Sequence, residues 1–445
     1  NIENQYPDLN YTGGIIEATD AWFKNNRYGV QIWSYHDGQK DYTSTFRRCS
    51  FVTNETLADN SNPEFFLSLA QVNGLLIEAC DFEYLISGNH SQMQNHGKGI
   101  FSFDAGFTVL DYQGGGDPIP SNFLNLEYGI FVTKYRENPN IIIRNSSFSS
   151  NLTSIYASGI TGIQIYLNDF YFSSLAVPPN NICAGVYLDH CTGYEIQKNT
   201  FQALGNPNES AIGITINNSG ETYNLINNNV FNNLYIGTLS QNYNRSIFEF
   251  EGLKIRCNKY LDNDYDIAVT GEEGCKDCGI ALYQGGPYNP AGNLFSVSGN
   301  QIYNIYNEGA SVSYYHHAKD DLNPPNPDPW VPEIVSPNVS KFNLRLFPWA
   351  ESYCESQYFE GMTKSQIETE YNTYSQIADS LKNSLDQLID GGSTESLGME
   401  IDFSQADEAL VLQEELLNSS PFLSDTILIK SAQKEDVLPP LMVKD

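Results

Sequence analysis

The sequence is poor in basic residues. Its 445 residues contain 23 lysines and arginines against 54 aspartates and glutamates, a formal net charge of −31 at pH 7. Nucleic-acid binding requires lysine and arginine clustered opposite the phosphates, so this balance argues against a nucleic-acid partner and equally against an anionic membrane surface. The sequence also lacks any run of 18 apolar residues, so it predicts no transmembrane helix and no direct membrane insertion.

Methionine is scarce, with 4 residues, whereas 29 tyrosines, 24 phenylalanines and 34 glycines are present. Charged residues make up only 17% of the chain, which is not the composition of a disordered acidic tail. These proportions favour a turn-rich β protein. The chain starts at Asn1 without a charged and then apolar leader, as either a cleaved signal peptide or a truncated sequence would leave it.

One phrase recurs along the chain: a short alternating strand, a small polar residue, one spacer and an aromatic residue. The aromatic residues that end the phrase are Phe51, Phe82, Phe148, Phe170, Phe201, Phe231 and Tyr260. Most spacings lie between 22 and 31 residues, and the gap of 66 residues from Phe82 to Phe148 predicts three turns. A repeat of this length is typical of a solenoid, because short strands bury a face only by stacking on identical neighbours.

A second strand type opens with glycine and continues with alternating apolar residues, as in Gly29–Ile32, Gly185–Leu188 and Gly213–Ile216. Together the two strand types predict a right-handed parallel β-helix of roughly nine to eleven turns within residues 1–318. A β-propeller or sandwich would need hairpin signals such as Asn-Gly, which are scarce here.

The small polar residue of the phrase stands two positions before the aromatic one. These residues are Cys49, Cys80, Ser146, Asn168, Asn199 and Asn229. Parallel stacking would place them about 4.8 Å apart, so we expect asparagine ladders and aromatic stacks at the corners. Asparagine also tolerates the left-handed backbone that a tight corner needs.

A proline-rich segment, residues 319–350, follows the repeat, with prolines at 324, 325, 327, 329 and 332. It predicts either an extended linker or a strap over the last turn. Residues 351–445 carry 19 acidic and 5 basic residues and form the third segment, expected to be helical.

The apolar spacing in this third segment changes to threes and fours. It predicts a helix from Met362 to Leu388 that ends at Gly391-Gly392, and a capping box at Ser404–Asp407 before a helix over Ala409–Leu417. A third helix is expected from Ser420-Pro421 through Ile429. The sequence stops soon after Leu438-Pro-Pro440, so the segment is expected to be cut short.

No metal or cofactor site is predicted. The six histidines show no metal-binding spacing, and His316-His317 is interpreted as part of an exposed edge strand. The motif Cys275-Lys-Asp-Cys278, with Cys257 nearby, favours a loop disulfide in some pairing over zinc. Cys49 and Cys80 are expected to stack either as a disulfide or as two thiols.

Two further motifs have weak chemical signals. Asp262-Asn-Asp264-Tyr-Asp266 alternates carboxylates and could hold calcium, but it lacks the glycine and terminal glutamate of an EF-hand, so a solvated loop is favoured. Gly114-Gly-Gly116-Asp117 is interpreted as a turn, since no Lys-Ser/Thr follows it.

Many β-helices act on polysaccharides, so catalytic residues were sought directly. The polygalacturonase-like NTD, DD and GHG signatures are absent, and no individual catalytic residue is predicted. A lyase needs an arginine or lysine base beside acidic calcium ligands, but the basic residues are scattered along the chain: Arg47, Arg48, Lys134, Arg136, Arg144 and Arg256.

These phrases resemble secreted right-handed β-helix proteins of Bacteroidetes that carry a type IX secretion sorting domain. The resemblance rests on the glycine-led strands, the Asn-x-Phe corners, Gly286–Phe295 with Asn300–Tyr303, and the tail phrases Leu417–Asp425 and Leu438–Pro440. It implies export by the type IX translocon to the cell surface or the medium, with adhesion or glycan contact as the common role. The β-sandwich sorting domain of that family does not occur within these 445 residues.

The sequence therefore predicts an exported β-helix protein, leaning towards a non-enzymatic role, that presents an elongated face for adhesion or glycan contact. Its expected partners are a polysaccharide, the translocon or another surface protein. Two alternatives remain open: a carbohydrate-active lyase or hydrolase, and a scaffold or cargo that binds a protein through its acidic helical tail.

Overall fold

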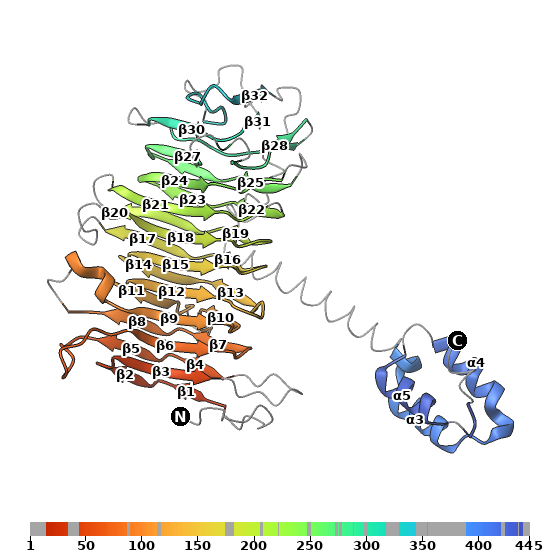
Figure 1. Ribbon diagram of the computed structural model, residues 1–445. Helices are drawn as coiled ribbons and strands as arrows, with labels where there is room; N and C mark the ends of the chain where they lie inside the picture. Colours follow the sequence, from red (N-terminus) through yellow and green to blue (C-terminus); the bar gives the residue numbers. More distant parts are fainter. Residues whose placement is uncertain are drawn as a thin grey trace. The chain divides into compact units, whose positions relative to one another are not determined.

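The computed structural model describes residues 15–33, 44–86, 90–113, 117–173, 182–204, 208–220, 222–246, 251–271, 275, 278–287, 289–297, 301–316, 329–343, 354, 389–419, 423–434 and 436–438 (Figure 1). The chain divides into two compact units between residues 357 and 358. Each unit is described by itself.

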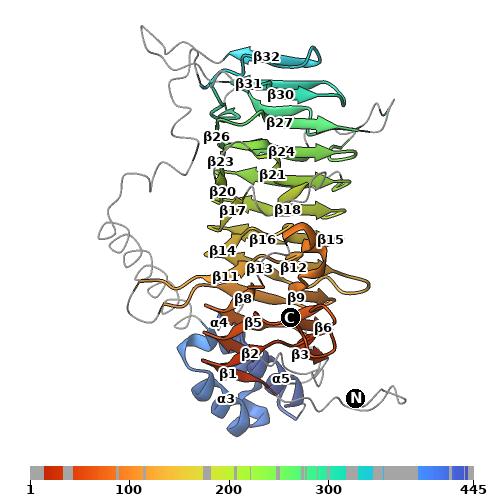
Figure 2. The ribbon, with the colours of Figure 1, turned by 90° about the vertical axis from the view of Figure 1, so that its left-hand side faces the viewer.

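The first unit is a parallel β-helix, which confirms the fold expected from the repeat. Three sheets run the length of the solenoid, and each turn contributes one strand to every sheet, so that strands stack three numbers apart (Figures 1 and 2). Sheet A consists of β1 (Glu17–Thr19), β4 (Thr45–Arg47), β7 (Leu75–Glu78), β10 (Phe107–Leu110), β13 (Ile141–Arg144), β16 (Gln164–Tyr166), β19 (Glu195–Gln197), β22 (Tyr223–Asn227) and β25 (Gly252–Arg256).

The other two sheets follow the same order. Sheet B consists of β2 (Trp22–Lys24), β5 (Ser50–Thr53), β8 (Asp81–Tyr84), β11 (Ser121–Leu124), β14 (Ser146–Ser149), β17 (Asp169–Ser173), β20 (Thr200–Leu204), β23 (Val230–Asn232) and β26 (Lys259–Leu261). Sheet C consists of β3 (Tyr28–Trp33), β6 (Phe65–Ala70), β9 (Lys98–Phe103), β12 (Tyr128–Thr133), β15 (Thr153–Ser158), β18 (Cys183–Asp189), β21 (Asn208–Asn217), β24 (Leu234–Gln241), β27 (Tyr265–Thr270) and β30 (Tyr303–Asn307).

A buried asparagine ladder holds the corner between sheets A and B. The Asn199 side chain accepts a hydrogen bond from the backbone N–H of Asn168 at 3.0 Å, and donates to Asn229 Oδ1 at 2.9 Å and to the Ile165 carbonyl at 3.0 Å. The same pattern continues through Asn258. The expected ladder is therefore present, and it satisfies backbone groups that the corner would otherwise leave unpaired inside the solenoid.

The left-handed residue of this corner is not the ladder asparagine. It is the residue immediately before the ladder position in every turn from Cys49 to Asn258 except that of Ser121, which Pro120 precedes. These residues are Arg48 (φ 50°), Ala79 (49°), Asn145 (49°), Leu167 (60°), Lys198 (58°), Asn228 (56°) and Cys257 (57°). The ladder asparagine keeps an ordinary backbone, and its role is hydrogen bonding rather than conformational tolerance. Residues of several types, charged and apolar, thus adopt the left-handed backbone conformation despite its energetic cost.

An aromatic stack two residues beyond the ladder fills the interior. Ring centroids of successive turns lie 4.5 to 5.0 Å apart from Phe23 to Tyr260, with interplanar angles of 10° or less. This stack explains the glycine that opens the sheet C strands. A Cβ on Gly213 would lie 2.6 Å from the Phe231 ring and 2.6 Å from the Gly237 carbonyl oxygen, so only glycine fits.

The gap between Phe82 and Phe148 contains two turns and not the three that its length suggested. Phe123 stacks between these two rings, in register with both. The extra residues form long connections, one of which contains the 3₁₀ helix η1 (His90–Asn95). Insertions at a corner leave the strand register unchanged, which is why length alone miscounts the turns.

The last turn is covered by a segment that returns after the proline-rich region. A small sheet has the order β29 (Asn289–Pro290), β28 (Tyr283–Gly286), β31 (Val312–His316) and β32 (Val339–Asn343). β32 pairs in parallel with β31, and the Pro329 carbonyl accepts a hydrogen bond from the Phe295 backbone N–H at 2.7 Å. The described part of the proline-rich segment thus packs on the last turn of the solenoid.

The second unit contains the helices α3 (Thr394–Phe403), α4 (Ala409–Ser419) and α5 (Asp425–Gln433), with the 3₁₀ helices η3 (Ile389–Gly392) and η4 (Ala406–Glu408). The expected helix over Met362–Leu388 lies outside the described residues. The capping box lies one residue later than expected, because Glu408 accepts from the Gln405 backbone N–H, while Ser404 ends α3. The third helix begins at Asp425, capped by Ser424, rather than after Pro421.

The asparagine ladder yields a stability prediction. We expect Asn199→Ala to lower the free energy of unfolding by roughly 2–5 kcal/mol, because it leaves the Asn168 N–H and the Ile165 carbonyl buried without partners, at roughly 1–3 kcal/mol each. Chemical denaturation of the purified chain measures this loss. The matched control is Asn232→Ala on the outward face of sheet B, expected within about 0.5 kcal/mol of the unaltered chain; equal losses in both variants would contradict the ladder's role.

Candidate functional site

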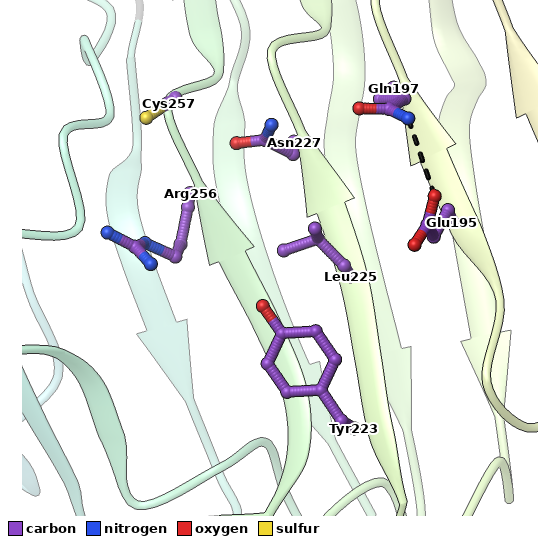
Figure 3. Close-up of a pocket in the computed structure, with 7 residues that line it drawn as sticks. All are labelled: Glu195, Gln197, Tyr223, Leu225, Asn227, Arg256 and Cys257. Atoms are coloured by element: carbon purple, nitrogen blue, oxygen red, sulfur yellow. Dashed lines mark hydrogen bonds between the residues drawn. The ribbon is translucent and has the colours of Figure 1, made fainter. Parts of the chain in front are cut away.

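A groove of about 360 Å³ lies on the outward face of sheet A, over three consecutive turns (Figure 3). We call it the sheet A groove. Its lining residues come from β19, β22 and β25 and from the corner that follows β25. They are Glu195, Gln197, Tyr223, Leu225, Asn227, Arg256 and Cys257.

The strand register explains why these side chains gather. Alternate residues of a strand point to opposite faces, and parallel neighbours lie about 4.8 Å apart, so outward residues form columns that run along the solenoid. One column contains Glu195, Leu225 and Lys254, and the other contains Gln197, Asn227 and Arg256. Residues about 60 positions apart in the sequence thus meet on one surface.

Tyr223 supplies the aromatic surface of the groove. Its side chain is 52% exposed, and its register partner in the next turn, Gly252, has no side chain to cover the ring. Lys254 approaches one side, with Nζ 5.6 Å from the ring centroid. Figure 3 shows the ring broadside, with its hydroxyl group directed towards the space between Leu225 and Arg256. An exposed aromatic face of this kind can pack against the apolar face of a sugar ring.

The charged groups in and beside the groove are unequally distributed, with Lys254 adjoining the lining residues through the Tyr223 ring. Lys254 and Arg256 stand two residues apart on β25, so both side chains project outward. Burial lowers the pKa of Lys254, and the neighbouring positive charge of Arg256 lowers it further. Arg256 Nη2 donates to the Pro290 carbonyl at 3.4 Å. Glu195, two strands away, accepts from the Gln197 amide at 3.5 Å. The groove therefore has a cationic end and a single carboxylate at the other.

A disulfide forms one edge of the groove. Cys257 lines it and is bonded to Cys354, 97 residues further along the chain. The bond ties the segment after the solenoid to its side. Sequence spacing did not reveal this pairing, because no motif links the two cysteines and Cys257 is nearer in sequence to Cys275 and Cys278.

A second aromatic column, on the outward face of sheet C, is arranged differently. Its rings belong to Phe101, Phe131, Tyr156 and Tyr187, and Phe65 stacks on Phe101 from a neighbouring position of the preceding turn. Successive centroids within the column lie 4.9 to 5.7 Å apart and the rings are stacked, with interplanar angles of 15° to 28°. Their faces are therefore occupied by one another. This column stabilises the sheet and offers a ligand only ring edges.

Most of the basic residues that are scattered along the sequence lie outside the groove. Arg47 pairs with Glu78 at 2.6 Å and Arg48 pairs with Asp20 at 2.7 Å. Arg256 is the member of that set that reaches the groove. The signal that could have found it is the outward position of Lys254 and Arg256 in a strand whose register had already been assigned from the repeat.

The cysteines behave largely as expected. Cys275 and Cys278 form a disulfide, which confirms the interpretation of that motif as a loop bridge. Cys49 and Cys80 are buried thiols, which decides between the two alternatives for the stacked pair; they donate to the carbonyls of Ala18 and Phe46, each at 3.4 Å. The turn expected at residues 114–116 lies outside the described part of the chain.

His316 was interpreted as part of an exposed edge strand, and this was wrong. It is 6% exposed, and β31 lies between β28 and β32 rather than at an edge. The strand β32 that covers β31 follows the prolines in the sequence, so the residues around His316 give no sign of this cover. His317 lies outside the described residues.

The carboxylates of residues 262–266 do not form a common site. Asp262 is exposed, whereas Asp266 points into the solenoid and is fully buried. Asp266 accepts hydrogen bonds from the Ser296 hydroxyl at 2.7 Å and from Asn304 Nδ2 at 3.0 Å. Among the residues that the structure describes, no group of three or more His, Cys, Asp or Glu side chains is placed to hold a metal ion.

Comparison with known proteins adds no family assignment: no family model, no curated protein and no solved structure matches this chain. Within the described residues, no helix is both long enough and apolar enough to cross a bilayer.

The burial of Asp266 predicts a pH dependence. Burial raises the pKa of Asp266 to about 6, against an ordinary value of 3.8, while hydrogen bonds from Ser296 and Asn304 oppose the shift. The folded chain therefore holds this proton more tightly than the unfolded chain. The stability from this group is fully present below pH 3.8 and is lost as the pH rises to about 6, at about 1.4 kcal/mol per pH unit.

Chemical denaturation at pH values from 4 to 8 measures the effect. The unaltered chain should lose unfolding free energy relative to Asp266→Asn between about pH 4 and 6, and the difference should stay constant above that range. Asp262→Asn, at an exposed position just before β27, is the control and should keep the slope of the unaltered chain. A constant difference between the unaltered chain and Asp266→Asn at all pH values would contradict the assignment.

Proposed function

We propose that this chain is an exported, surface-associated β-helix protein whose sheet A groove holds a polysaccharide chain without cleaving it. The observation that carries the proposal is the exposed ring of Tyr223 over a groove bordered by polar side chains. Sugar-binding sites combine an aromatic surface for the apolar ring face with planar polar groups for the hydroxyls. Gln197, Asn227 and Arg256 supply those groups.

A binding role fits the groove better than hydrolysis does. Hydrolysis of a glycosidic bond by the usual routes needs two carboxyl groups about 5 to 10 Å apart. Among the described residues that line the groove, Glu195 is the single carboxylate. A lyase-like site would bring several acidic ligands to one cation, and the described groove residues do not include them. Export through a type IX translocon remains part of the proposal and rests on the resemblance of the repeat and tail phrases.

One observation favours a second candidate, protein contact through the helical unit. Its helices carry large apolar side chains that are mostly exposed, namely Phe403 (76%), Leu410 (70%) and Val411 (66%). Exposed apolar groups of this size in a small helical unit are typical of surfaces that meet another protein. This role would be compatible with glycan contact by the solenoid.

The test of the proposed function is polysaccharide retention by Tyr223→Ala. We expect the unaltered chain to be retarded in affinity electrophoresis by at least one polysaccharide of a broad panel, without formation of new chain ends. Loss of the ring should weaken that binding about tenfold, because aromatic packing contributes roughly 1–1.5 kcal/mol. Tyr135→Ala is the control, since Tyr135 is 75% exposed and lies outside the groove.

Two results would contradict the proposal. Equal retention of the Tyr223→Ala and Tyr135→Ala variants would remove the groove as the binding site. New reducing ends or unsaturated products in the reaction with the unaltered chain would show an enzyme instead of a binding protein.

A further inference from the structure

Two cations at one end of the sheet A groove distinguish it from the acidic remainder of the chain. Lys254 and Arg256 both project from the outward face of β25, about 7 Å apart along the strand. The whole chain has 23 basic residues and a formal charge of −31. A pair of neighbouring cations beside a groove is therefore a departure from the general composition.

Lys254 contacts an aromatic ring and a leucine rather than an acidic side chain among the described residues. Among the ion pairs of the described residues, none includes Lys254, whereas Arg47, Arg48 and Lys98 each have a carboxylate. Its register neighbour in the preceding turn is Leu225, and its ammonium group lies 5.6 Å from the Tyr223 ring centroid. The ammonium group is thus half-buried next to an aromatic face and a second cation.

This arrangement costs free energy that an anion would recover. Desolvation and the positive charge of Arg256 both act against the charged form of Lys254. An anionic group next to Lys254 would reverse the second effect and give the ammonium group an ionic partner. The guanidinium group of Arg256, whose Nη2 also donates to the Pro290 carbonyl, can in addition donate a charge-assisted hydrogen bond to a carboxylate or sulfate.

We infer that the polysaccharide held by the sheet A groove is anionic, with its carboxylate or sulfate groups bound between Lys254 and Arg256. The inference rests on the proposed function and specifies the ligand class of the same site. Tyr223 lies beside the cations and would pack against the ring that carries the acidic group. Asn227 and Gln197 precede Arg256 in the same column by one and two turns, and they would form hydrogen bonds with hydroxyl groups of the polysaccharide.

Glu195 would set the orientation of a polysaccharide chain in the groove. It lies two strand spacings from Lys254 in the same column, about 10 Å along the solenoid axis. A carboxylate at that distance repels an acidic substituent and accepts hydrogen bonds from hydroxyl groups. A chain bound along the axis would therefore direct its acidic group to the β25 end and neutral hydroxyls to the β19 end.

Matched polysaccharide pairs test the charge requirement. Polygalacturonate and its methyl ester share one backbone and differ in the carboxylate charge, and dextran sulfate and dextran differ in sulfate. We expect the charged member of at least one pair to bind the unaltered chain at least tenfold more tightly than its neutral counterpart at low salt, with a gap that narrows as salt rises. Which pair shows the gap distinguishes carboxylate from sulfate.

Non-specific polyelectrolyte attraction does not explain such a result, because a chain with a net charge of −31 repels polyanions as a whole. The variants Lys254→Gln and Arg256→Gln should each weaken anionic binding about tenfold or more, as expected when a hydrogen bond to a charged group is removed. Lys24→Gln on sheet B is the control and should change binding less than twofold. Arg256→Lys keeps the positive charge but loses the planar guanidinium group, so its affinity should lie between that of the unaltered chain and that of Arg256→Gln.

Thermal unfolding of each variant ensures that a loss of binding is not a loss of fold, and Lys254→Gln removes no described hydrogen bond. Equal binding of charged and neutral members, or anionic binding that survives both glutamine variants, would overturn the inference. If binding of a neutral polysaccharide still depends on Tyr223, the proposed function stands while the charge specificity fails. If no binding depends on Tyr223, the proposed function itself fails.

Discussion

In-register stacking of parallel turns is the constraint on which the rest of this structure depends. Each residue lies about 4.8 Å from its counterparts in the turns above and below, so every interior side chain must pack against the same or a similar side chain in the neighbouring turns. Aromatic rings stack on one another through nine successive contacts from Phe23 to Phe295, all of them phenylalanine except Tyr260, and asparagine meets asparagine at the neighbouring corner. Glycine opens the sheet C strands because the ring beneath leaves no room for a Cβ. Three separate features of the repeat thus follow from one spacing.

The same constraint explains which parts of the fold the sequence predicted. Repeated side chains at a repeated depth produce a repeated phrase, so the β-helix and its ladder could be inferred from Phe170, Phe201 and Phe231 alone. The turn that contains Phe123 was not placed because long insertions separate its strands and hide the spacing of the repeat. The corner conformation was misassigned because positive φ falls on residues such as Leu167 and Lys198, which carry no sequence signature of it.

The candidate site was harder to predict because it belongs to the outward face, where stacking imposes no repetition. Glu195, Tyr223 and Arg256 have no common motif and become neighbours only when the register of three turns is known. The Cys257–Cys354 bond at the groove edge joins segments 97 residues apart, which spacing rules cannot anticipate. The half-buried strand β31 was likewise misread, since its cover β32 arrives from beyond the prolines.

A comparison of the two exposed aromatic surfaces shows how a solenoid can separate stability from binding. On sheet C, aromatic residues in successive turns satisfy one another, and the column is closed to a flat ligand. Tyr223 has Gly252 as its register neighbour in the next turn, so no aromatic ring stacks on it there; its side chain is 52% exposed, with Lys254 near one face. An aromatic residue is available to a ligand here because the next turn offers no counterpart of its own kind. On a repetitive fold, outward positions without such a counterpart are where a ligand can reach an aromatic face, and the cations beside Tyr223 add charge to this one.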